Sequence, residues 1–416
     1  MSVKAYYASM LHLMVAMEPL ESPTLPDPTV VRIGFWTIYL LSTLYIFHSL
    51  LVAYINSTYM EQFLRPSVVS AFFTIGSAFS AVAFIFFTPL LRRYGNNRLT
   101  IYIALLDILS LIALGTSQNV YIAVSAFLLF LTVNPILFLN IDIYAESLIG
   151  NNEGDTGKKR GLTLTLMSAA SLLSPLAMAA IVALTDDLMY VYLAAAGCFV
   201  IFVLFIQFYY KGFVDPHYKE IPYRATLLRA FQIRDVRNVC FAHFLLQMFF
   251  TWMIIYVPLY LVTELGYDWE AVGSILAVAM AAYVIFEYPV GLVADRYWGE
   301  QELMALGFLI LAVSSSWIGF MTASATIVAW MIVMFISRVG AALVETTTES
   351  YFFKHTSGDD ADLINVFRLL RPIASVFGAL IGSICLTVFP FSFMFFILGF
   401  LMIPGLFFTM MLTDTR

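Results

Sequence analysis

Long apolar runs, separated by short polar or basic segments, follow one another along nearly the whole chain. A helix needs roughly 20 apolar residues to cross a bilayer core about 30 Å thick. The runs therefore predict an all-α membrane protein with twelve transmembrane helices. We place their apolar cores at residues 34–56, 67–91, 99–117, 119–145, 162–184, 188–210, 237–262, 270–293, 303–321, 324–347, 365–388 and 391–412.

Composition supports a membrane protein and excludes an ordinary soluble domain. Hydrophobic residues make up 61% of the chain and charged residues only 12%, against about 25% charged residues in typical soluble domains. The three cysteines lie inside apolar runs, where they are expected to pack as small buried side chains. No zinc-type or disulfide spacing is present. We expect no cofactor, no metal and no nucleic-acid partner.

Positive charges predict the orientation of the spans. When the twelve spans are threaded through a membrane, nineteen of the 21 Lys and Arg residues fall on one side. Arg65 falls on the other side and Arg338 lies inside a span. Since cytoplasmic loops are enriched in Lys and Arg, both termini are predicted to be cytoplasmic. The expected location is a cell membrane, plasma or inner, crossed many times.

A basic segment near the middle divides the chain into two sets of six spans. The predicted organisation is an N-terminal tail over 1–33, six-helix bundles over 34–210 and 237–412, and a central cytoplasmic loop over 211–236. Within this loop, Leu227, Leu228 and Phe231 alternate with basic residues at helical spacing. This predicts a short helix at the membrane surface, with a plain basic linker as the alternative.

The two six-span sets share a repeated charge pattern. The pattern appears in the segments Asp142–Ser147 and Glu345–Ser350. Each has a carboxylate at its first and fifth positions, and the two segments are offset by 203 residues. At the same offset, Arg93 and Arg296 each precede a tyrosine just after the second span of their set. These matches indicate two pseudo-symmetric six-helix bundles, a construction found in one large class of transporters.

The loops after spans 2 and 8 carry parts of one motif. Gly291-Leu-Val-Ala-Asp295-Arg296 resembles the loop motif of the major facilitator superfamily, although Glu300 stands where that motif has a basic residue. The first set keeps Arg93-Tyr94-Gly95 but has Arg92 in place of the aspartate. This resemblance covers essentially residues 34–412. It implies a transporter that works by alternating access, with spans 1, 4, 7 and 10 lining a central cavity.

The motif also suggests a cytoplasmic gate. Arg296 offers a planar fork suited to a carboxylate, and its expected partner is Glu349, with Arg93 and Glu146 as the pseudo-equivalent pair. The alternative is ordinary surface salt bridges, typically worth under about 1 kcal/mol each. The gate candidates are Arg92, Arg93, Asp142, Glu146, Gly291, Asp295, Arg296, Glu349, Arg368 and Arg371.

Ionisable residues inside the spans are the candidates for contact with a transported species. Arg338 is expected to bind an anionic solute or, as the favoured alternative, to pair internally with Glu345 or Glu287. Glu287 is a candidate proton carrier because desolvation favours the neutral carboxyl. For Asp107 we expect a helix–helix hydrogen bond.

The resemblance adds polar and aromatic cavity candidates from spans 1, 4 and 7. His48 is one of them, with a hydrogen-bonded packing role as its alternative. The full cavity set is His48, Asn134, Gln247, Trp252, Tyr256, Glu287, Arg338 and Glu345. Gly378 and Gly382 form a small-xxx-small pattern that favours close helix packing.

The expected function is secondary active transport of a small organic solute by alternating access of the rocker-switch type, coupled to a proton or solute gradient. The chain carries no nucleotide-binding loop, which argues against an ATP-driven pump. The alternatives are a sensor or scaffold that retains the fold and, less favoured, a membrane-embedded enzyme. The five histidines are scattered without catalytic spacing, so we predict no enzyme activity. The expected partners are the solute, H⁺ and lipid, with the protein a monomer.

Overall fold

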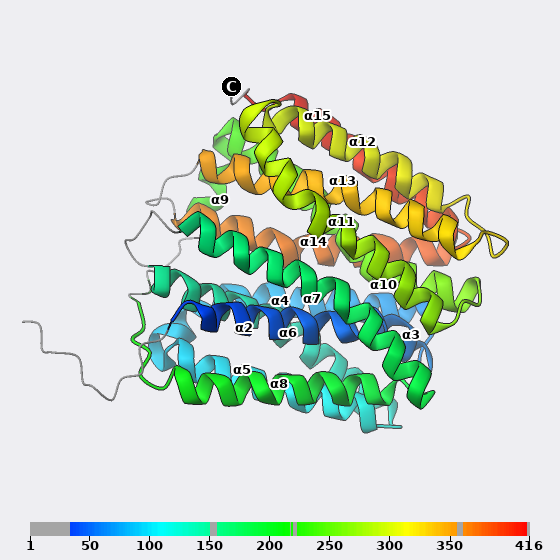
Figure 1. The fold of residues 1–416 in the computed structure, drawn as a ribbon, viewed down its shortest axis with the longest axis horizontal. Helices are drawn as coiled ribbons and strands as arrows, with labels where there is room; N and C mark the ends of the chain where they lie inside the picture. Colours follow the sequence, from blue (N-terminus) through cyan, green and yellow to red (C-terminus); the bar gives the residue numbers. More distant parts are fainter. Residues whose placement is uncertain (1–33, 150–155, 217, 219–222, 356–360, 414–416) are drawn as a thin grey trace, which may run out of the picture. The chain divides into compact units, whose positions relative to one another are not determined.

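The computed structural model describes residues 34–149, 156–216, 218, 223–355 and 361–413, and this part of the chain is entirely helical (Figure 1). The tail expected over residues 1–33 lies outside it. The elements are α2 (Trp36–Ala53), α3 (Asn56–Glu61), α4 (Pro66–Tyr94), α5 (Asn96–Thr116), α6 (Val120–Ile149), α7 (Thr156–Thr185), α8 (Met189–Tyr209), α9 (Tyr223–Gln232), α10 (Arg234–Leu259), the π-helical turn η2 (Tyr260–Glu264), α11 (Trp269–Arg296), α12 (Glu300–Ile318), α13 (Ile327–Lys354), α14 (Ala361–Val388) and α15 (Phe393–Met410).

Among the described residues, twelve segments are long and apolar enough to span a membrane, which confirms the predicted number. The first span joins α2 and α3, and the seventh joins α10 and η2. Several helices run further than their apolar cores. α6 continues to Ile149 and α13 to Lys354, so the repeated carboxylates lie on the last turns of transmembrane helices.

The helices pack in two groups that contact each other through a few helix pairs. We call α2–α8 the first half and α10–α15 the second half. Across the halves, α4 packs on α14, α7 packs on α11, and α3 packs on α10. Figure 1 shows α7 and α11 side by side. We call the two ends of the bundle the α3 end and the α9 end.

Two glycines allow α14 to pack closely against α10 inside the second half. Gly378 and Gly382 on α14 face α10, and a Cβ at Gly378 would lie 3.2 Å from Thr251. A Cβ at Gly382 would overlap the ring of Tyr256. The predicted small-xxx-small pattern is therefore the place where α10 and α14 approach each other closely.

A glycine turn joins α4 to α5 at the α9 end. Gly95 has φ +78°, a conformation that favours glycine. A Cβ there would also collide with the carboxylate of Asp215, which accepts a hydrogen bond of 2.6 Å from the backbone N–H of Asn96. A carboxylate at a helix N-terminus is favourable because the helix dipole is positive there.

Candidate functional site

The second-half charges at the α9 end are partnered differently from the prediction. Glu349 accepts a hydrogen bond from Arg368 on α14, with Nη1 and Oε1 3.1 Å apart, and both side chains are about one-third exposed (32% and 31%). Arg296, its predicted partner, has an exposed side chain at the end of α11. Among the described residues, no ion pair joins Arg296 to Glu349 in this structure, in which Arg368 of α14 bonds Glu349 instead. The Arg296–Glu349 pair is expected to form only when the cavity opens outward, so it stays a prediction. The side chain of Asp295 lies outside the described part.

Arg368 also faces carboxylates of the first half. It interacts electrostatically with Asp142 and Glu146 on the last turns of α6. Its neighbour one turn away, Arg371, donates from Nε to the amide oxygen of Gln247 at 3.1 Å. The guanidinium of Arg371 lies 5.8 Å from the ring centroid of Phe138 on α6. Two arginines of α14 thus bridge toward α6 from the second half.

In the first half, the motif residues contact the segment that joins α8 to α9, which we call the central segment. Arg92 donates to the backbone oxygen of Tyr218 at 2.9 Å, and Arg93 lies over the ring of Tyr94 at 5.3 Å. Tyr218 donates to Asp215 at 2.6 Å. Burial and this hydrogen bond raise the pKa of Tyr218, which keeps the phenol as a donor. Asp215 thus places a carboxylate at the N-terminus of α5, beside Arg92's partner Tyr218, a contact that the sequence pattern did not indicate.

Glu300, the motif's departure from the family pattern, is buried at the start of α12. It pairs with Lys354 and accepts a hydrogen bond of 2.9 Å from Ser350. Gly291, the motif's glycine, has open surroundings, because a Cβ there would meet only Thr346 at 3.9 Å. The acid that breaks the expected pattern is thus a fixed part of the α12–α13 contact.

A buried polar cluster occupies the core of the first half. His48 Nε2 and Asp107 Oδ2 are 2.7 Å apart, and both side chains are fully buried. Asn134 donates to Asp107 at 3.2 Å and to Ser49 at 3.0 Å. The imidazole also stacks on Phe199 of α8, with centroids 3.8 Å apart. The helix–helix hydrogen bond expected for Asp107 is confirmed. His48 is hydrogen-bonded and packed as its alternative role requires, and its cavity role stays a prediction.

The candidates on α10 serve different purposes. Trp252 and Tyr256 are fully buried and donate to the backbone oxygens of Gly378 at 2.7 Å and Ala379 at 3.1 Å. They hold α10 against α14. Gln247, one turn before Thr251, instead turns its amide oxygen toward Arg371.

Two of the predicted intramembrane acids lie near the junction of the halves. Glu287 on α11 accepts a hydrogen bond of 3.0 Å from Ser168 on α7, across the halves. Glu345 lies on α13 and is half-buried. It interacts electrostatically with Glu287 and Glu349, and with Arg371 of α14. The acids of α11 and α13 therefore form one electrostatic group.

Arg338 stands apart from this group. Its side chain is 1% exposed, and Nε and Nη1 have no hydrogen-bond partner. Among the described residues, no ion pair joins it to Glu345 or Glu287, so the favoured internal pairing is not formed. Glu345 is seven residues further along α13, a rise of about 10 Å, and Glu287 is already bonded to Ser168.

The halves meet closely toward the α3 end. Tyr54, between α2 and α3, donates to the sulfur of Met280 on α11 at 3.6 Å. Ser383 of α14 donates to the backbone oxygen of Ser67 on α4 at 2.9 Å. A Cβ at Gly273 of α11 would lie 2.4 Å from the Cβ of Ala179 on α7. These contacts leave no room for a passage at those points.

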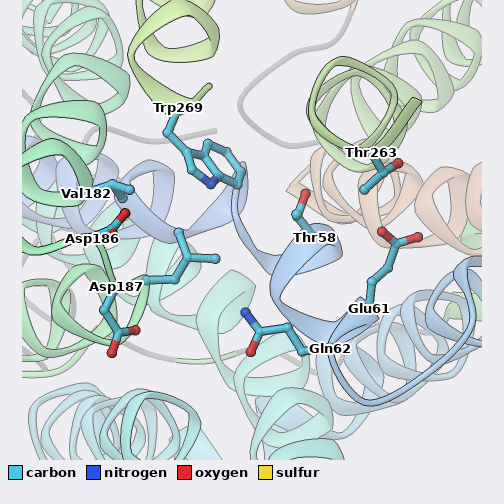
Figure 2. Close-up of a pocket in the computed structure, with 9 residues that line it drawn as sticks. Thr58, Glu61, Gln62, Val182, Asp186, Asp187, Thr263 and Trp269 are labelled. Carbon is cyan, nitrogen blue, oxygen red and sulfur yellow. The ribbon is translucent and has the colours of Figure 1, made fainter. Parts of the chain in front are cut away.

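A cavity of about 480 Å³ lies at the α3 end (Figure 2). Its lining comes from α3, the end of α7, the α7–α8 connection, η2 and the start of α11. The lining residues are Thr58, Glu61, Gln62, Val182, Asp186, Asp187, Leu188, Thr263 and Trp269. The sequence pattern did not indicate this cavity. Among the described residues, no group of three His, Cys, Asp or Glu residues could hold a metal ion.

Known proteins share this architecture. The family model for the Major Facilitator Superfamily matches residues 239–416. A POT family transporter in complex with 5-aminolevulinic acid superposes with a TM-score of 0.73 at 12% identity, over 90% of this chain and 94% of that one. The nucleoside transporter NupG (D323A mutant) gives 0.70 at 11%, over 91% and 100%. A POT family transporter in complex with a thioalcohol-conjugated peptide gives 0.72 at 13%, over 90% and 94%.

A search of the curated proteins finds no significant sequence match. At such low identities the structural matches show the fold alone. The sequence match of the second half to the family model is independent of them. With its twelve candidate spans, the chain is a multi-pass membrane protein built like these transporters. The second half of the chain, over residues 239–416, thus resembles the major facilitator superfamily in sequence, and the whole described part shares its fold with these solved transporters.

Proposed function

We propose that the chain is a secondary active transporter that moves a small organic solute by alternating access of its two halves. Energy would come from a proton or solute gradient. The family match over residues 239–416 and the fold shared with solved transporters support transport as such. Support for a small organic solute comes from two fold relatives, which were crystallised with 5-aminolevulinic acid and with a peptide conjugate.

The proposal includes an orientation. Among the described residues, nearly all Lys and Arg residues belong to loops and helix ends on the α9 side of the bundle. By the positive-inside rule, the α9 end faces the cytoplasm and both termini are cytoplasmic. The protein would act as a monomer in a cell membrane. Helix α9, with exposed Leu228 and Phe231, would lie along the cytoplasmic membrane surface.

The observation that carries the proposal is the difference between the two ends. At the α3 end, side chains and backbones of the two halves are in direct contact. At the α9 end, the salt bridge of Glu349 stays within the second half, and its two side chains are about one-third exposed (32% and 31%). We assign this difference to an inward-facing state, in which the halves are in direct contact at the α3 end and face each other at the α9 end through Arg368 and Arg371 of α14 and the carboxylates of α6.

The predicted cytoplasmic gate takes a revised form. In the inward-facing state Arg368 pairs with Glu349, and Asp142 and Glu146 of α6 lie within its electrostatic reach. When the α9 end closes, α6 would approach α14. Arg368 would then bond carboxylates of both halves, which would hold the inner mouth shut.

Coupling to protons would use Glu287 and Glu345. Glu287 bonds Ser168 across the halves, so a change in its protonation would alter a contact that must break when the halves rock. Glu345 interacts electrostatically with both Glu287 and Arg371. The pair would therefore respond to a proton and to the inner opening together.

A flux experiment tests this function. Purified protein in liposomes is screened for solute uptake with and without an imposed pH gradient, and Glu349→Gln is compared with the wild type. We expect the variant to insert normally, to transport more slowly and to change cysteine accessibility at the inner mouth. The matched control is Glu302→Gln, an exposed glutamate in the first turn of α12.

Unchanged transport in Glu349→Gln would reduce the gate to an ordinary surface salt bridge. If no solute in a broad panel crosses the liposome membrane, the chain is a sensor or scaffold that keeps the fold. Flux without a pH-gradient effect would remove the proton from the mechanism and leave a solute gradient as the driving force.

A further inference from the structure

Arg338 is a buried cation that the proposed gate and coupling residues do not use. It lies in the middle of α13 with a side chain 1% exposed. Two of its three guanidinium nitrogens, Nε and Nη1, are buried without a hydrogen-bond partner. Within the described part of the chain, neither an acid nor a carbonyl oxygen accepts from it.

The surroundings of Arg338 are aromatic and apolar. The guanidinium lies 5.3 Å from the ring centroid of Phe249 on α10. It interacts electrostatically with the hydroxyls of Tyr54 and Tyr283. Met280, which receives the hydrogen bond of Tyr54, lies on the same helix as Tyr283. The group therefore joins α10, α11 and α13 of the second half to the first span.

This arrangement is unusual for a purely structural arginine. Buried polar groups in folded proteins nearly always have partners, and an intramembrane charge normally pairs or marks a solute pathway. A guanidinium presents planar donors that match the two oxygens of a carboxylate. Aromatic rings around it would receive the apolar body of the same molecule rather than a second charge.

We propose that Arg338 binds the carboxylate of the transported solute, an organic acid whose apolar body packs among Phe249, Tyr54 and Tyr283. The Tyr54–Met280 contact would then be the lid that separates this site from the α3 end. The inference rests on the proposed transport function, and it narrows the solute class from small organic molecules to organic anions.

Ligand-dependent thermal stability of the purified protein tests the site without requiring flux. The probes are phenylacetate, indole-acetate and hexanoate, each compared with its uncharged amide. We expect the wild type to bind at least one acid in preference to its amide. Arg338→Gln should weaken this binding about thirtyfold or more, the loss typical of removing one partner from a buried charged pair. Arg338→Lys should retain part of it.

Two further measurements keep the test decisive. Arg338→Met without ligand should unfold at the same temperature as the wild type or higher, because removing an unpaired buried charge leaves no acid without its partner. The matched control is Ser337→Ala, whose hydroxyl bonds only within its own helix, to Met334 at 2.7 Å. It should keep wild-type binding.

Three binding and stability results would each overturn the inference: equal binding of acid and amide, unchanged acid binding in Arg338→Gln, or a strong loss of stability in ligand-free Arg338→Met. A fourth result, flux of uncharged solutes that does not depend on Arg338, would also overturn it, while leaving the transport function intact. Acid binding that depends on Arg338 but is never accompanied by flux would instead support the site and refute the transport function.

Discussion

The buried His48–Asp107 pair allows the sharpest test of what stabilises the first half. Asp107→Leu removes the carboxylate that accepts from His48 at 2.7 Å and from Asn134 at 3.2 Å. Both donors would be left in a fully buried site. An unsatisfied buried donor costs about 1–3 kcal/mol, so the loss in free energy of unfolding should be about 2–6 kcal/mol.

A second substitution should recover much of that loss. In His48→Phe with Asp107→Leu, both members of the pair become apolar, and replacing a buried pair by apolar groups is often neutral. The new phenyl ring can also stack on Phe199, as the imidazole does at 3.8 Å. A double-mutant cycle should therefore give a favourable coupling between the two substitutions of about 2 kcal/mol or more.

The assay is reversible unfolding in mixed micelles, followed by tryptophan fluorescence for the wild type, both single variants and the double variant. Solute uptake by the folded fraction is measured alongside. Because the pair packs within the first half, KM should stay at its wild-type value. An Asp107→Leu loss below about 1 kcal/mol, or additive single effects, would refute the structural role. A large rise in KM would place His48 in the solute path after all.

Two other substitutions follow from close contacts. Gly273→Leu should prevent closure at the α3 end, because even a Cβ would lie 2.4 Å from the Cβ of Ala179; spin-label distances between α3 and α11 should lengthen. Gly197→Leu, at a position with nothing within 4 Å, is its control, and equal distances in both variants would contradict the packing. Asp215→Ala should lower stability by about 1 kcal/mol, because the backbone N–H of Asn96 loses its acceptor; this is measured as faster proteolysis of the central segment, and unchanged proteolysis would exclude that role.

The spans were predictable because hydropathy is a local property. The length of each apolar run predicts the length of its span. The break predicted at Ser117–Asn119, between the third and fourth spans, is the gap between α5 and α6. Helix ends were less predictable. α13 continues to Lys354, which pairs with the buried Glu300 of α12. Counting apolar residues cannot predict a contact between two distant charged side chains.

Partners across the chain were the hardest to predict. Two carboxylates at matching offsets suggested matching arginines, yet Glu349 pairs with Arg368. The choice depends on how closely α14 approaches α13, a tertiary property that spacing along the sequence does not encode. The contact of Asp215 with the start of α5 was missed for the same reason. Asp215 follows Asn96 by 119 residues, and only the fold brings the two together.

Comparing positions 203 residues apart shows how the two halves differ in their buried ionisable residues. Subtracting 203 from 338 gives Pro135, so the first half has no counterpart of Arg338. Its buried ionisable residues His48 and Asp107 are hydrogen-bonded to each other. A paired charge stabilises the half that holds it, whereas an unpaired one costs stability until a ligand supplies the missing acceptor. If Arg338 binds the solute as proposed, this asymmetry makes the first half the scaffold and assigns recognition of the anionic solute to α13 of the second half.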